Sequence, residues 1–349
     1  MSALKPELND KFDPRESAFA LTDNEREQIE NLIGGLTPWK DCQFDDRFFT
    51  GMEITARGIP ERLAAALIEF RRNSNDCGTL LVRNLPFDQD LPATPEDGRI
   101  SDSKKTSFSE YNLLLSMIHL GEPIAYEDEK GGAIIQNVCP VKGEECRQEN
   151  TGSVAFLKFH TEDGFHPCKP DYVGLICLRA DHERIAQTLT ASVRTALHLI
   201  PARTISILRE PLYRIRLSSS FMRGGDNPQL YSTPMPVLSG DAREPDFTID
   251  CHAMEAVEPS AEQALETMKS ALDQVGIGWV LLPGDMVIVD NRVAAHARTP
   301  FKPMYDGQDR WLQRLFVVED YRRTRASRYP GKHVCVSLGI ELFNQTKAS

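Results

Sequence analysis

Short runs of Val, Ile, Leu and Phe, separated by turn residues, dominate the chain from Ala133 onward. Runs of this length and composition are typical of β-strands that are buried on at least one face. The pattern therefore predicts a mainly β protein with many short strands. The expected strands are AIIQNV, VAFLKF, YVGLICL, QTLTASV, FTID, GWVLL, MVIVD and LQRLFVV.

A helical pattern occupies the first part of the chain instead. The segment Thr22-Asp23-Asn24 is suited to cap a helix with the sequence EREQIENLIGGL, which ends at a glycine pair. Pro60 opens a second helix, in which Leu63, Leu67 and Phe70 fall on one face. These helices predict a set of α additions beside the β core.

Four further segments complete the expected organisation. We expect a strand in GTLLVRNLP, a buried helix behind the sheet in LLLSMIH, a helical insert in ALETMKSALDQVG, and a loop over the functional site in LPATPEDGRISDSKK, residues 91–105. All residues, 1–349, are expected to form a single domain, with a helical part at 1–75 and a β core at 76–325.

Composition excludes several classes of partner. The net charge of −11 and the pI of about 5.3 argue against nucleic acid or a membrane surface, because both select basic patches. The eight cysteines lack CxxC pairs, and the N-terminus lacks the apolar stretch of a signal peptide. We therefore expect no membrane span and a reduced, cytoplasmic compartment.

A candidate metal site begins at His160-Thr161-Glu162. On an extended strand the side chains of His160 and Glu162 point to the same face, because side chains alternate with a period of two. A third ligand must come from elsewhere, and His296 lies far enough downstream for the chain to cross a β-sandwich and return. Two histidines and one carboxylate on one face leave open positions, as in non-haem Fe(II) oxygenases.

Many short strands with an embedded metal triad predict a double-stranded β-helix, the jelly-roll or cupin-like architecture, flanked by helices. Two longer segments carry a specific resemblance. Residues 159–200, from FHTEDGFHPCKPDYVGLICL onward, and residues 285–320, DMVIVDNRVAAHARTPFKPMYDGQDRWLQRLFVVED, resemble the clavaminate synthase-like branch of the Fe(II)/2-oxoglutarate oxygenases. That branch includes hydroxylases of free arginine, asparagine and lysine.

The resemblance implies Fe(II) as the metal, with 2-oxoglutarate and O2 as cosubstrates. It assigns Arg310 to the distal carboxylate of 2-oxoglutarate, for which the guanidinium fork is suited, with Thr188 assisting. A carboxylate at Glu162 indicates hydroxylation, because related halogenases carry a small residue there and bind chloride in its place.

The same resemblance assigns Arg314 to the α-carboxylate of the substrate. Arg310 and Arg314 are an even number of residues apart, so a strand would present both on one face. Two inward arginines are costly in a core without anionic partners, which supports roles in ligand binding.

For the substrate side chain, the resemblance points to Asp250 and, from the opposite side, to Glu127. Arginine hydroxylases carry a second aspartate where this chain has His252, so two carboxylates around a compact ammonium fit better than a guanidinium. The alternative for Glu127 is an acidic surface position. Asn150 and Ser153 lie in a segment that the family uses to cover the substrate.

The sequence therefore predicts a hydroxylase of a free L-amino acid, with L-lysine as the expected substrate and C4, or C3, as the carbon oxidised. Three alternatives stay open: L-arginine or another polar amino acid as substrate, desaturation or cyclisation in place of hydroxylation, and a cupin-like binding protein. Retention of all of His160, Glu162, His296 and Arg310 argues against the last, because a binding protein has no need of the full set.

Overall fold

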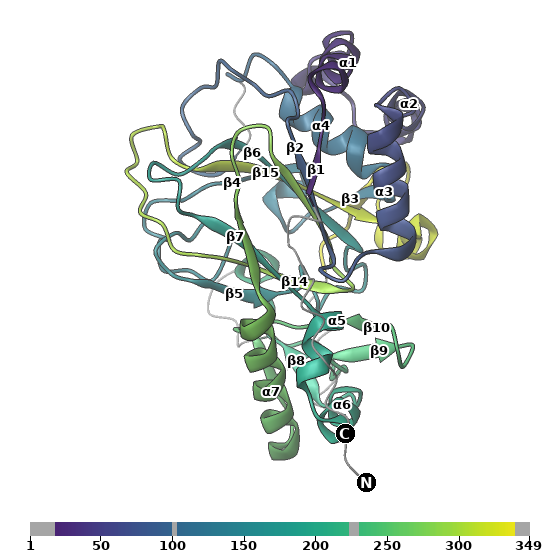
Figure 1. Cartoon of the computed structure of the whole chain (residues 1–349), viewed down its shortest axis with the longest axis vertical. Coiled ribbons are helices and arrows are strands. Elements are labelled where there is room, and N and C mark those ends of the chain that lie inside the picture. Colours follow the sequence, from purple (N-terminus) through teal and green to yellow (C-terminus); the bar gives the residue numbers. More distant parts are fainter. Residues whose placement is uncertain (1–17, 100–102, 223–229, 339–349) are drawn as a thin grey trace.

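The computed structural model describes residues 18–99, 103–222 and 230–338. Within these ranges two β-sheets form the middle of the molecule (Figure 1). The larger sheet has eight strands, in the spatial order β1 (Ala18–Ala20), β2 (Thr79–Arg83), β13 (Met286–Asp290), β6 (Tyr172–Arg179), β15 (Trp311–Val318), β3 (Glu122–Tyr126) and β16 (Val334–Cys335), with β4 (Ile135–Val138) also paired to β15. The smaller sheet has four, in the order β12 (Ile277–Val280), β7 (Gln187–Ser192), β14 (Ala294–Arg298) and β5 (Leu157–His160).

Apolar side chains from both sheets pack into one core. Leu175 of β6 and Phe316 of β15 belong to the same buried cluster as Ala191 of β7 and Ala295 of β14. Two largely antiparallel sheets that share a core in this way form a double-stranded β-helix, so the predicted fold is confirmed.

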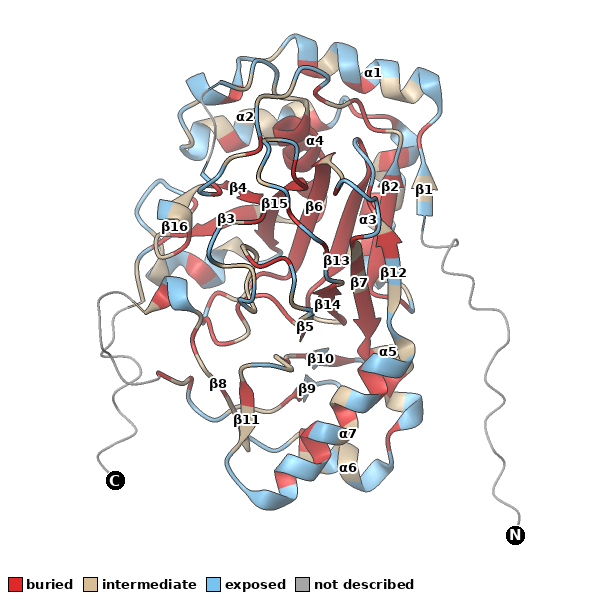
Figure 2. Ribbon diagram, turned by 90° about the vertical axis from the view of Figure 1, so that its left-hand side faces the viewer, coloured by how far each residue is buried: buried red, intermediate tan, exposed pale blue. Residues whose placement is uncertain are grey.

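Helices cover the outer face of the larger sheet (Figures 1 and 2). They are α1 (Asp23–Gly34), α2 (Asp46–Ala56), α3 (Glu61–Asn73) and α4 (Phe108–Met117). Ile176 of β6 and Leu315 of β15 join Leu67 of α3 and Leu114 of α4 in a second core cluster. Leu175 and Ile176 enter different clusters because neighbouring residues of a strand point to opposite faces.

The N-terminal helices follow their sequence signals closely. In α1 the Thr22 backbone N–H donates to Glu25 Oε2 at 2.8 Å, and Thr22 Oγ1 accepts from the Glu25 backbone at 3.3 Å, which is a capping box. In α3 the predicted apolar face is buried. Helix α2 was not predicted, because only Phe49 and Ala56 of its residues are buried and its apolar pattern is weak.

A smaller group of elements lies below the sheets in Figure 1. It contains α5 (Val193–Ala196), α6 (Ala202–Leu208), α7 (Pro259–Val275) and the strand pairs β8 (Tyr213–Ile215) with β11 (Met254–Ala256) and β9 (Leu238–Gly240) with β10 (Pro245–Phe247). The predicted helical insert is α7, which begins at Pro259 rather than at Ala264. Short 3-10 helices are η2 (Trp39–Asp41), η3 (Lys130–Gly132), η4 (Leu197–Leu199), η5 (Ser219–Phe221) and η6 (Tyr321–Ser327).

Three strand expectations need correction. The run FTID is not a strand: β10 ends at Phe247, and Asp250 forms only an isolated bridge with His160. Strand β14, which carries His296, was not predicted. Strands β1 and β16 extend the large sheet beyond the predicted core of residues 76–325.

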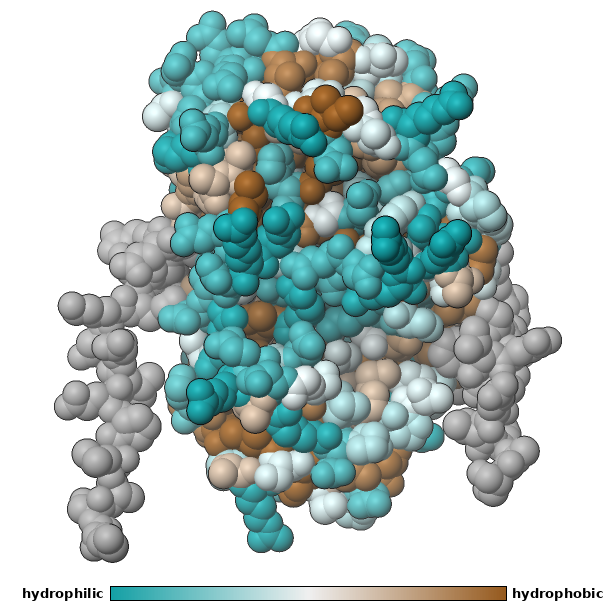
Figure 3. All heavy atoms as spheres, turned by 90° about the vertical axis from the view of Figure 1, so that its right-hand side faces the viewer, coloured by the Kyte–Doolittle hydropathy of each residue, from teal (hydrophilic) through white to brown (hydrophobic). Residues whose placement is uncertain are grey.

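Polar side chains cover much of the surface (Figure 3). On the face drawn in Figure 3, hydrophilic side chains cover most of the middle, and hydrophobic ones gather near the upper and lower ends. Among the helices that the structure describes, none is long and apolar enough to cross a membrane.

Candidate active site

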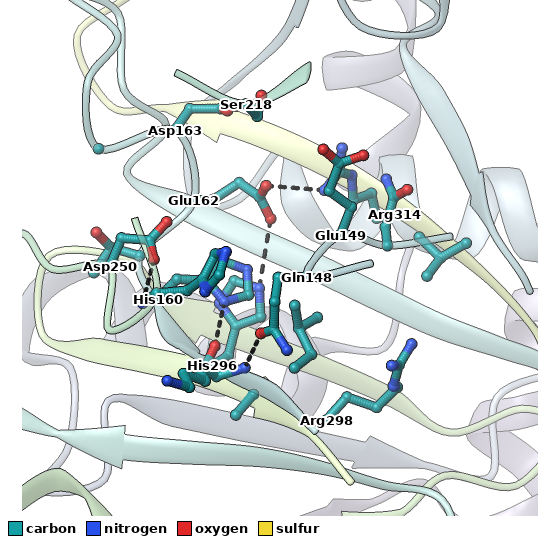
Figure 4. A pocket seen from close by; sticks show the side chains of 18 of the residues that line it. Gln148, Glu149, His160, Glu162, Asp163, Ser218, Asp250, His296, Arg298 and Arg314 are labelled. Atoms are coloured by element: carbon teal, nitrogen blue, oxygen red, sulfur yellow. Dashed lines mark hydrogen bonds and ion pairs between the residues drawn. The ribbon is translucent and has the colours of Figure 1, made fainter. Parts of the chain in front are cut away.

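His160, Glu162 and His296 lie together at the wall of a pocket between the two sheets (Figure 4). One potential ligand atom of each lies within 4.8 Å of the others. The two histidines are register partners on the neighbouring strands β5 and β14, and their ring centroids are 4.3 Å apart. Glu162 Oε2 lies 3.4 Å from His296 Nε2. The structure thus brings together the three ligands proposed from the sequence.

The hydrogen bond of His160 prepares its other nitrogen for a metal. Nδ1 of His160 lies 2.8 Å from the backbone oxygen of Lys158. A carbonyl oxygen only accepts, so Nδ1 carries the proton and Nε2 presents a lone pair. Metal-binding histidines are commonly oriented in this way.

Electrostatics keep His296 and Glu162 in the protonation states that a metal needs. Burial lowers the pKa of His296, and the neighbouring His160 lowers it further, so the ring is neutral. Burial alone would raise the pKa of Glu162, but the charge of Arg314 and the hydrogen bond with His296 outweigh it and lower that pKa. Two imidazoles and one carboxylate fit Fe(II) with positions left open.

Asn291 holds the turn that carries Glu162. Its side-chain oxygen accepts from the Glu162 backbone N–H at 2.8 Å. Its Nδ2 donates to the Glu162 backbone oxygen at 3.1 Å and to the Pro170 oxygen at 2.8 Å. Asn291 is fully buried, so no water can replace these bonds.

Asn291→Ala is therefore expected to lower the free energy of unfolding by about 3 kcal/mol, because each buried polar group left unsatisfied costs roughly 1–3 kcal/mol. Iron affinity should fall as well, because Glu162 loses its fixed position. Denaturant unfolding and competition with a chelator measure the two effects. Asn137→Ala is the control: its buried amide accepts from Trp311 Nε1 outside the triad, so stability should fall while iron affinity is kept. An Asn291→Ala protein with wild-type iron affinity would contradict the assigned role.

Arg310 reaches the same pocket from the residue before β15. Its guanidinium is buried, and Nη2 donates to Thr188 Oγ1 at 3.2 Å. No described carboxylate lies within salt-bridge distance of it, and burial lowers its pKa. A buried guanidinium with one hydroxyl partner is suited to receive a carboxylate.

Arg298 stands beside Arg310 and was missed by the sequence analysis. It is buried, and it donates to the backbone oxygens of Gly152 and Ala155, the second at 3.0 Å. Burial and then the charge of Arg310 lower the pKa of Arg298 to about 9. The signal was available, because Arg298 follows His296 by two positions on one strand and so shares its face.

Arg314 lies next to the metal ligands. It donates to Glu162 Oε1 at 2.9 Å and to Glu129 Oε2 at 2.8 Å, and it also bonds Gln136 Oε1 at 2.7 Å. Burial alone would lower the pKa of Arg314, but the charges of Glu129 and Glu162 raise it. Arg310 and Arg314, which the family resemblance assigned to the two ligand carboxylates, both line the pocket.

Glu127 does not line the pocket, contrary to the predicted substrate cage. Its Oε2 accepts from Tyr329 Oη at 2.8 Å and from the Ser337 backbone at 3.1 Å, near the C-terminal strand. Glu129, two residues later, lines the pocket instead. Strand β3 ends at Tyr126 and the chain turns, so alternation no longer predicts which side chain points inward.

Ser153 and the described residues of the loop at 91–105 also lie outside the pocket lining. Ser153 is fully buried, and its backbone is tied to Glu145 and Phe301. In the described part of the loop, Thr94 bonds to Gly307 and Asp309; residues 100–102 lie outside the described ranges. Asn150 and Asp250 do line the pocket, as predicted residues of the substrate end.

Comparison with known proteins places this site in a family. Residues 121–316 match the family described as Taurine catabolism dioxygenase TauD, TfdA family. An L-asparagine oxygenase of Streptomyces coelicolor is 43% identical over 272 residues, which are 77% of this chain and 79% of that protein. An L-lysine 3-hydroxylase of Catenulispora acidiphila is 33% identical over 319 residues, 90% of this chain and 88% of that protein.

A solved structure extends the likeness to the whole fold. The structure of an asparagine oxygenase in complex with Fe(II), 2S,3S-3-hydroxyasparagine and succinate has a TM-score of 0.85 at 37% identity, and it covers 92% of this chain and 100% of that one. Fold, triad and relatives together define an oxygenase that depends on Fe(II), 2-oxoglutarate and O2. The chain belongs to the TauD/TfdA family, in its clavaminate synthase-like branch, whose members here hydroxylate free amino acids.

Proposed function

We propose that this enzyme hydroxylates C3 of a free L-amino acid with a short polar side chain, and that L-asparagine is the first candidate. The amino acid, 2-oxoglutarate and O2 give the hydroxyamino acid, succinate and CO2. Fe(II) bound at His160, Glu162 and His296 supplies the oxidising chemistry, and the chain binds and orients both organic substrates.

The observation that carries the proposal is the position of the two substrate anchors. Arg314 bonds Glu162, and Asp250 forms a backbone bridge with His160. Each anchor therefore stands directly beside a metal ligand. An amino acid with its α-carboxylate at Arg314 and its side-chain end at Asp250 spans the metal, and this favours a short molecule with C3 nearest the iron.

The chemistry of the far end supports an amide. Oδ1 of Asp250 accepts from the backbones of His252 and Ala253 at 2.8 and 2.7 Å, so the carboxylate is fixed. Asn150 and Lys158 also line the pocket, and Arg216 bonds His252 at 3.2 Å. An amide both donates and accepts, which matches a carboxylate and a carboxamide, whereas two neighbouring cations oppose an ammonium.

L-Lysine, the substrate expected from the sequence, is the second candidate. Asp250 alone gives one carboxylate for its ammonium, and the lysine 3-hydroxylase from Catenulispora is similar along most of the chain. Glu127 does not line the pocket, so the second carboxylate expected for the lysine ammonium is missing. This weakens the case for lysine, because a buried ammonium needs compensating negative charge. The lysine 3-hydroxylase and the asparagine oxygenase bound to 3-hydroxyasparagine are both named for position 3, which supports C3 over the C4 expected from the sequence.

Turnover of a panel of free amino acids, followed by NMR of the product, tests the proposal. We expect succinate formation with L-asparagine to exceed that with L-lysine, L-arginine and L-ornithine, with the new hydroxyl on C3. Faster turnover of L-lysine would select the second candidate, and absence of turnover with every free amino acid would overturn the proposal.

The eight cysteines, all free, agree with the reduced, cytoplasmic compartment that we also propose.

Asp250→Ala is expected to raise the KM for the preferred amino acid by roughly tenfold to a hundredfold, the effect of losing a hydrogen bond to a charged group of about 1.5–3 kcal/mol. The KM for 2-oxoglutarate should stay unchanged, because Arg310 and Thr188 are untouched. Asp246→Ala is the control, because Asp246 lies on β10 at the surface, outside the pocket lining. Equal amino-acid KM values in Asp250→Ala and wild type would show that another residue reads the side chain.

A further inference from the structure

Resting on the proposed function, we propose that Asp163 is a substrate-positioning residue that, together with Glu129 and Ser218, holds the α-ammonium of the amino acid. Asp163 follows the metal ligand Glu162 directly and was not among the residues singled out in the sequence. The assignment makes a free α-amino group a condition of binding.

Three buried carboxylates meet at this point of the pocket. One oxygen each from Glu129, Glu162 and Asp163 lies within 4.8 Å of the others. Only Arg314 among the described cations bonds this group, and its bonds go to Glu129 and Glu162. Buried charges of one sign are costly unless a partner compensates them, so a further cation at this point would stabilise the third carboxylate.

Asp163 is the carboxylate without that partner. The residue is 7% exposed, and its Oδ2 is buried without a hydrogen bond to any described group. Ser218 Oγ is buried and without a hydrogen bond in the same way. Both residues line the pocket, and Figure 4 draws them on the same side of it, beyond Glu162. Two unpartnered polar atoms facing one pocket indicate a ligand group that donates hydrogen bonds.

The backbone holds Asp163 in this position. Its φ of 47° is in the left-handed region, which aspartate tolerates better than most residues. The His166 backbone N–H donates to the backbone oxygen of Asp163 at 2.8 Å and closes the turn. Asn291 fixes the preceding residue, Glu162. Glu162 and Asp163, although adjacent in sequence, therefore both face the pocket.

An α-amino acid fits the cluster better than a second metal ion does. Glu129 is already held by the Arg314 guanidinium at 2.8 Å, so a metal between the carboxylates would be close to a positive charge. In a zwitterion the carboxylate and the ammonium are joined through one carbon. A substrate whose carboxylate lies at Arg314 thus carries its ammonium to the neighbouring carboxylates, and the three N–H donors match Glu129, Asp163 and Ser218.

The consequence is selectivity for an unmodified amine. An analogue that lacks the α-amino group leaves Asp163 without its partner. An Nα-acyl group removes the positive charge and brings a carbonyl oxygen toward the carboxylates, which repel it. Peptides and Nα-acetyl amino acids should therefore be excluded by charge and by desolvation as well as by size.

Equilibrium binding under anaerobic conditions, with Fe(II) and 2-oxoglutarate present, tests the assignment by calorimetry. The ligand pairs are L-asparagine with succinamic acid, its desamino analogue, and L-lysine with 6-aminohexanoic acid. We expect the wild type to prefer the α-amino member of the pair it binds, and Asp163→Asn to reduce this preference roughly tenfold to a hundredfold, as for one charged hydrogen bond. Ser218→Ala should reduce it less.

Asp285→Asn is the matched control, because Asp285 is a buried aspartate that accepts from the Leu282 backbone outside the pocket. It should keep the full preference, and all variants should keep the affinity for 2-oxoglutarate. An unchanged preference in Asp163→Asn overturns the assignment while the proposed function stands. Equal binding of both members of a pair by the wild type also overturns the assignment, and this result can be obtained even if the variant fails to fold.

Two further outcomes are decisive. A second equivalent of metal in the wild type, lost in Asp163→Asn without change in the ligand preference, would assign the cluster to a metal and overturn the inference. Absence of binding by L-asparagine, L-lysine and all other free amino acids would remove the proposed function, and the inference with it.

Discussion

His296→Ala is expected to abolish iron binding and 2-oxoglutarate turnover together. The variant keeps only His160 and Glu162 of the three proposed ligands, which lie two positions apart in the chain, and it loses the ligand that the neighbouring strand β14 contributes. The His296 imidazole is neutral at neutral pH because burial and His160 lower its pKa, so it binds metal without first losing a proton. Metal analysis of the purified protein and succinate release measure the two losses.

His182→Ala is the matched control for this prediction. His182 forms a separate group with Asp306 and Asp309 on the exposed side of the molecule, the other described cluster that contains a histidine and potential metal ligands. The variant should keep its iron and its turnover. If His182→Ala lost its iron while His296→Ala kept it, the metal would belong to the cluster of His182, Asp306 and Asp309, and the assigned triad would be refuted.

The fold of His296→Ala should be retained. His296 Nδ1 has no hydrogen-bond partner among the described groups, and its side chain lines the pocket rather than the core. Circular dichroism and thermal unfolding of the metal-free proteins should therefore be close to those of the wild type. A variant that unfolds would indicate a structural role for the ring instead.

The ligand set could be proposed from the sequence, although part of the reasoning differs from the structure. Alternation along a strand was the reason for pairing His160 with Glu162, yet β5 ends at His160 and Glu162 lies in the following turn. Asn291, which is distant in sequence, orients that turn. Local periodicity therefore identified the residues, but a tertiary contact sets their geometry.

His296 illustrates a second limit of prediction. Its strand, AAHAR, is rich in alanine and carries little β-propensity, so no strand was expected there. The segment becomes a strand because β5 and β7 pair with it on both sides. Pairing partners far away in sequence override local preference, and a single sequence does not reveal them.

The acidic residues of the pocket show the same limit for side-chain direction. In the run AYEDE, Glu127 was predicted to contact the substrate and Glu129 was not. The chain turns after Tyr126, and Glu129 lines the pocket while Glu127 does not. Asp163 faces the pocket only because its backbone is left-handed. Much of the proposed substrate-binding part of the pocket lies on loops and turns, which have no fixed period. The sequence was therefore least able to predict the direction of side chains there.

Arg310→Lys should raise the KM for 2-oxoglutarate by roughly tenfold to a hundredfold, the equivalent of about 1.5–3 kcal/mol for a charged hydrogen bond. Lysine keeps a positive charge but loses the planar fork that binds a carboxylate through two bonds. The KM for the amino acid should change little, because Arg314 is unaffected. Arg179→Lys is the control: Arg179 donates to Thr94 Oγ1 and to the Gly307 oxygen outside the pocket lining.

The pH dependence of Arg310→Lys distinguishes a direct carboxylate contact from a structural role. Burial already lowers the pKa of Arg310, which nevertheless stays charged, whereas a lysine in the same position loses its proton far more easily. The protonated form is the one that binds the carboxylate, so lowering the pH should restore affinity for 2-oxoglutarate in the lysine variant. The wild type should show no such gain over the same range. A KM ratio between variant and wild type that is independent of pH would mean that residue 310 does not hold the cosubstrate by its charge.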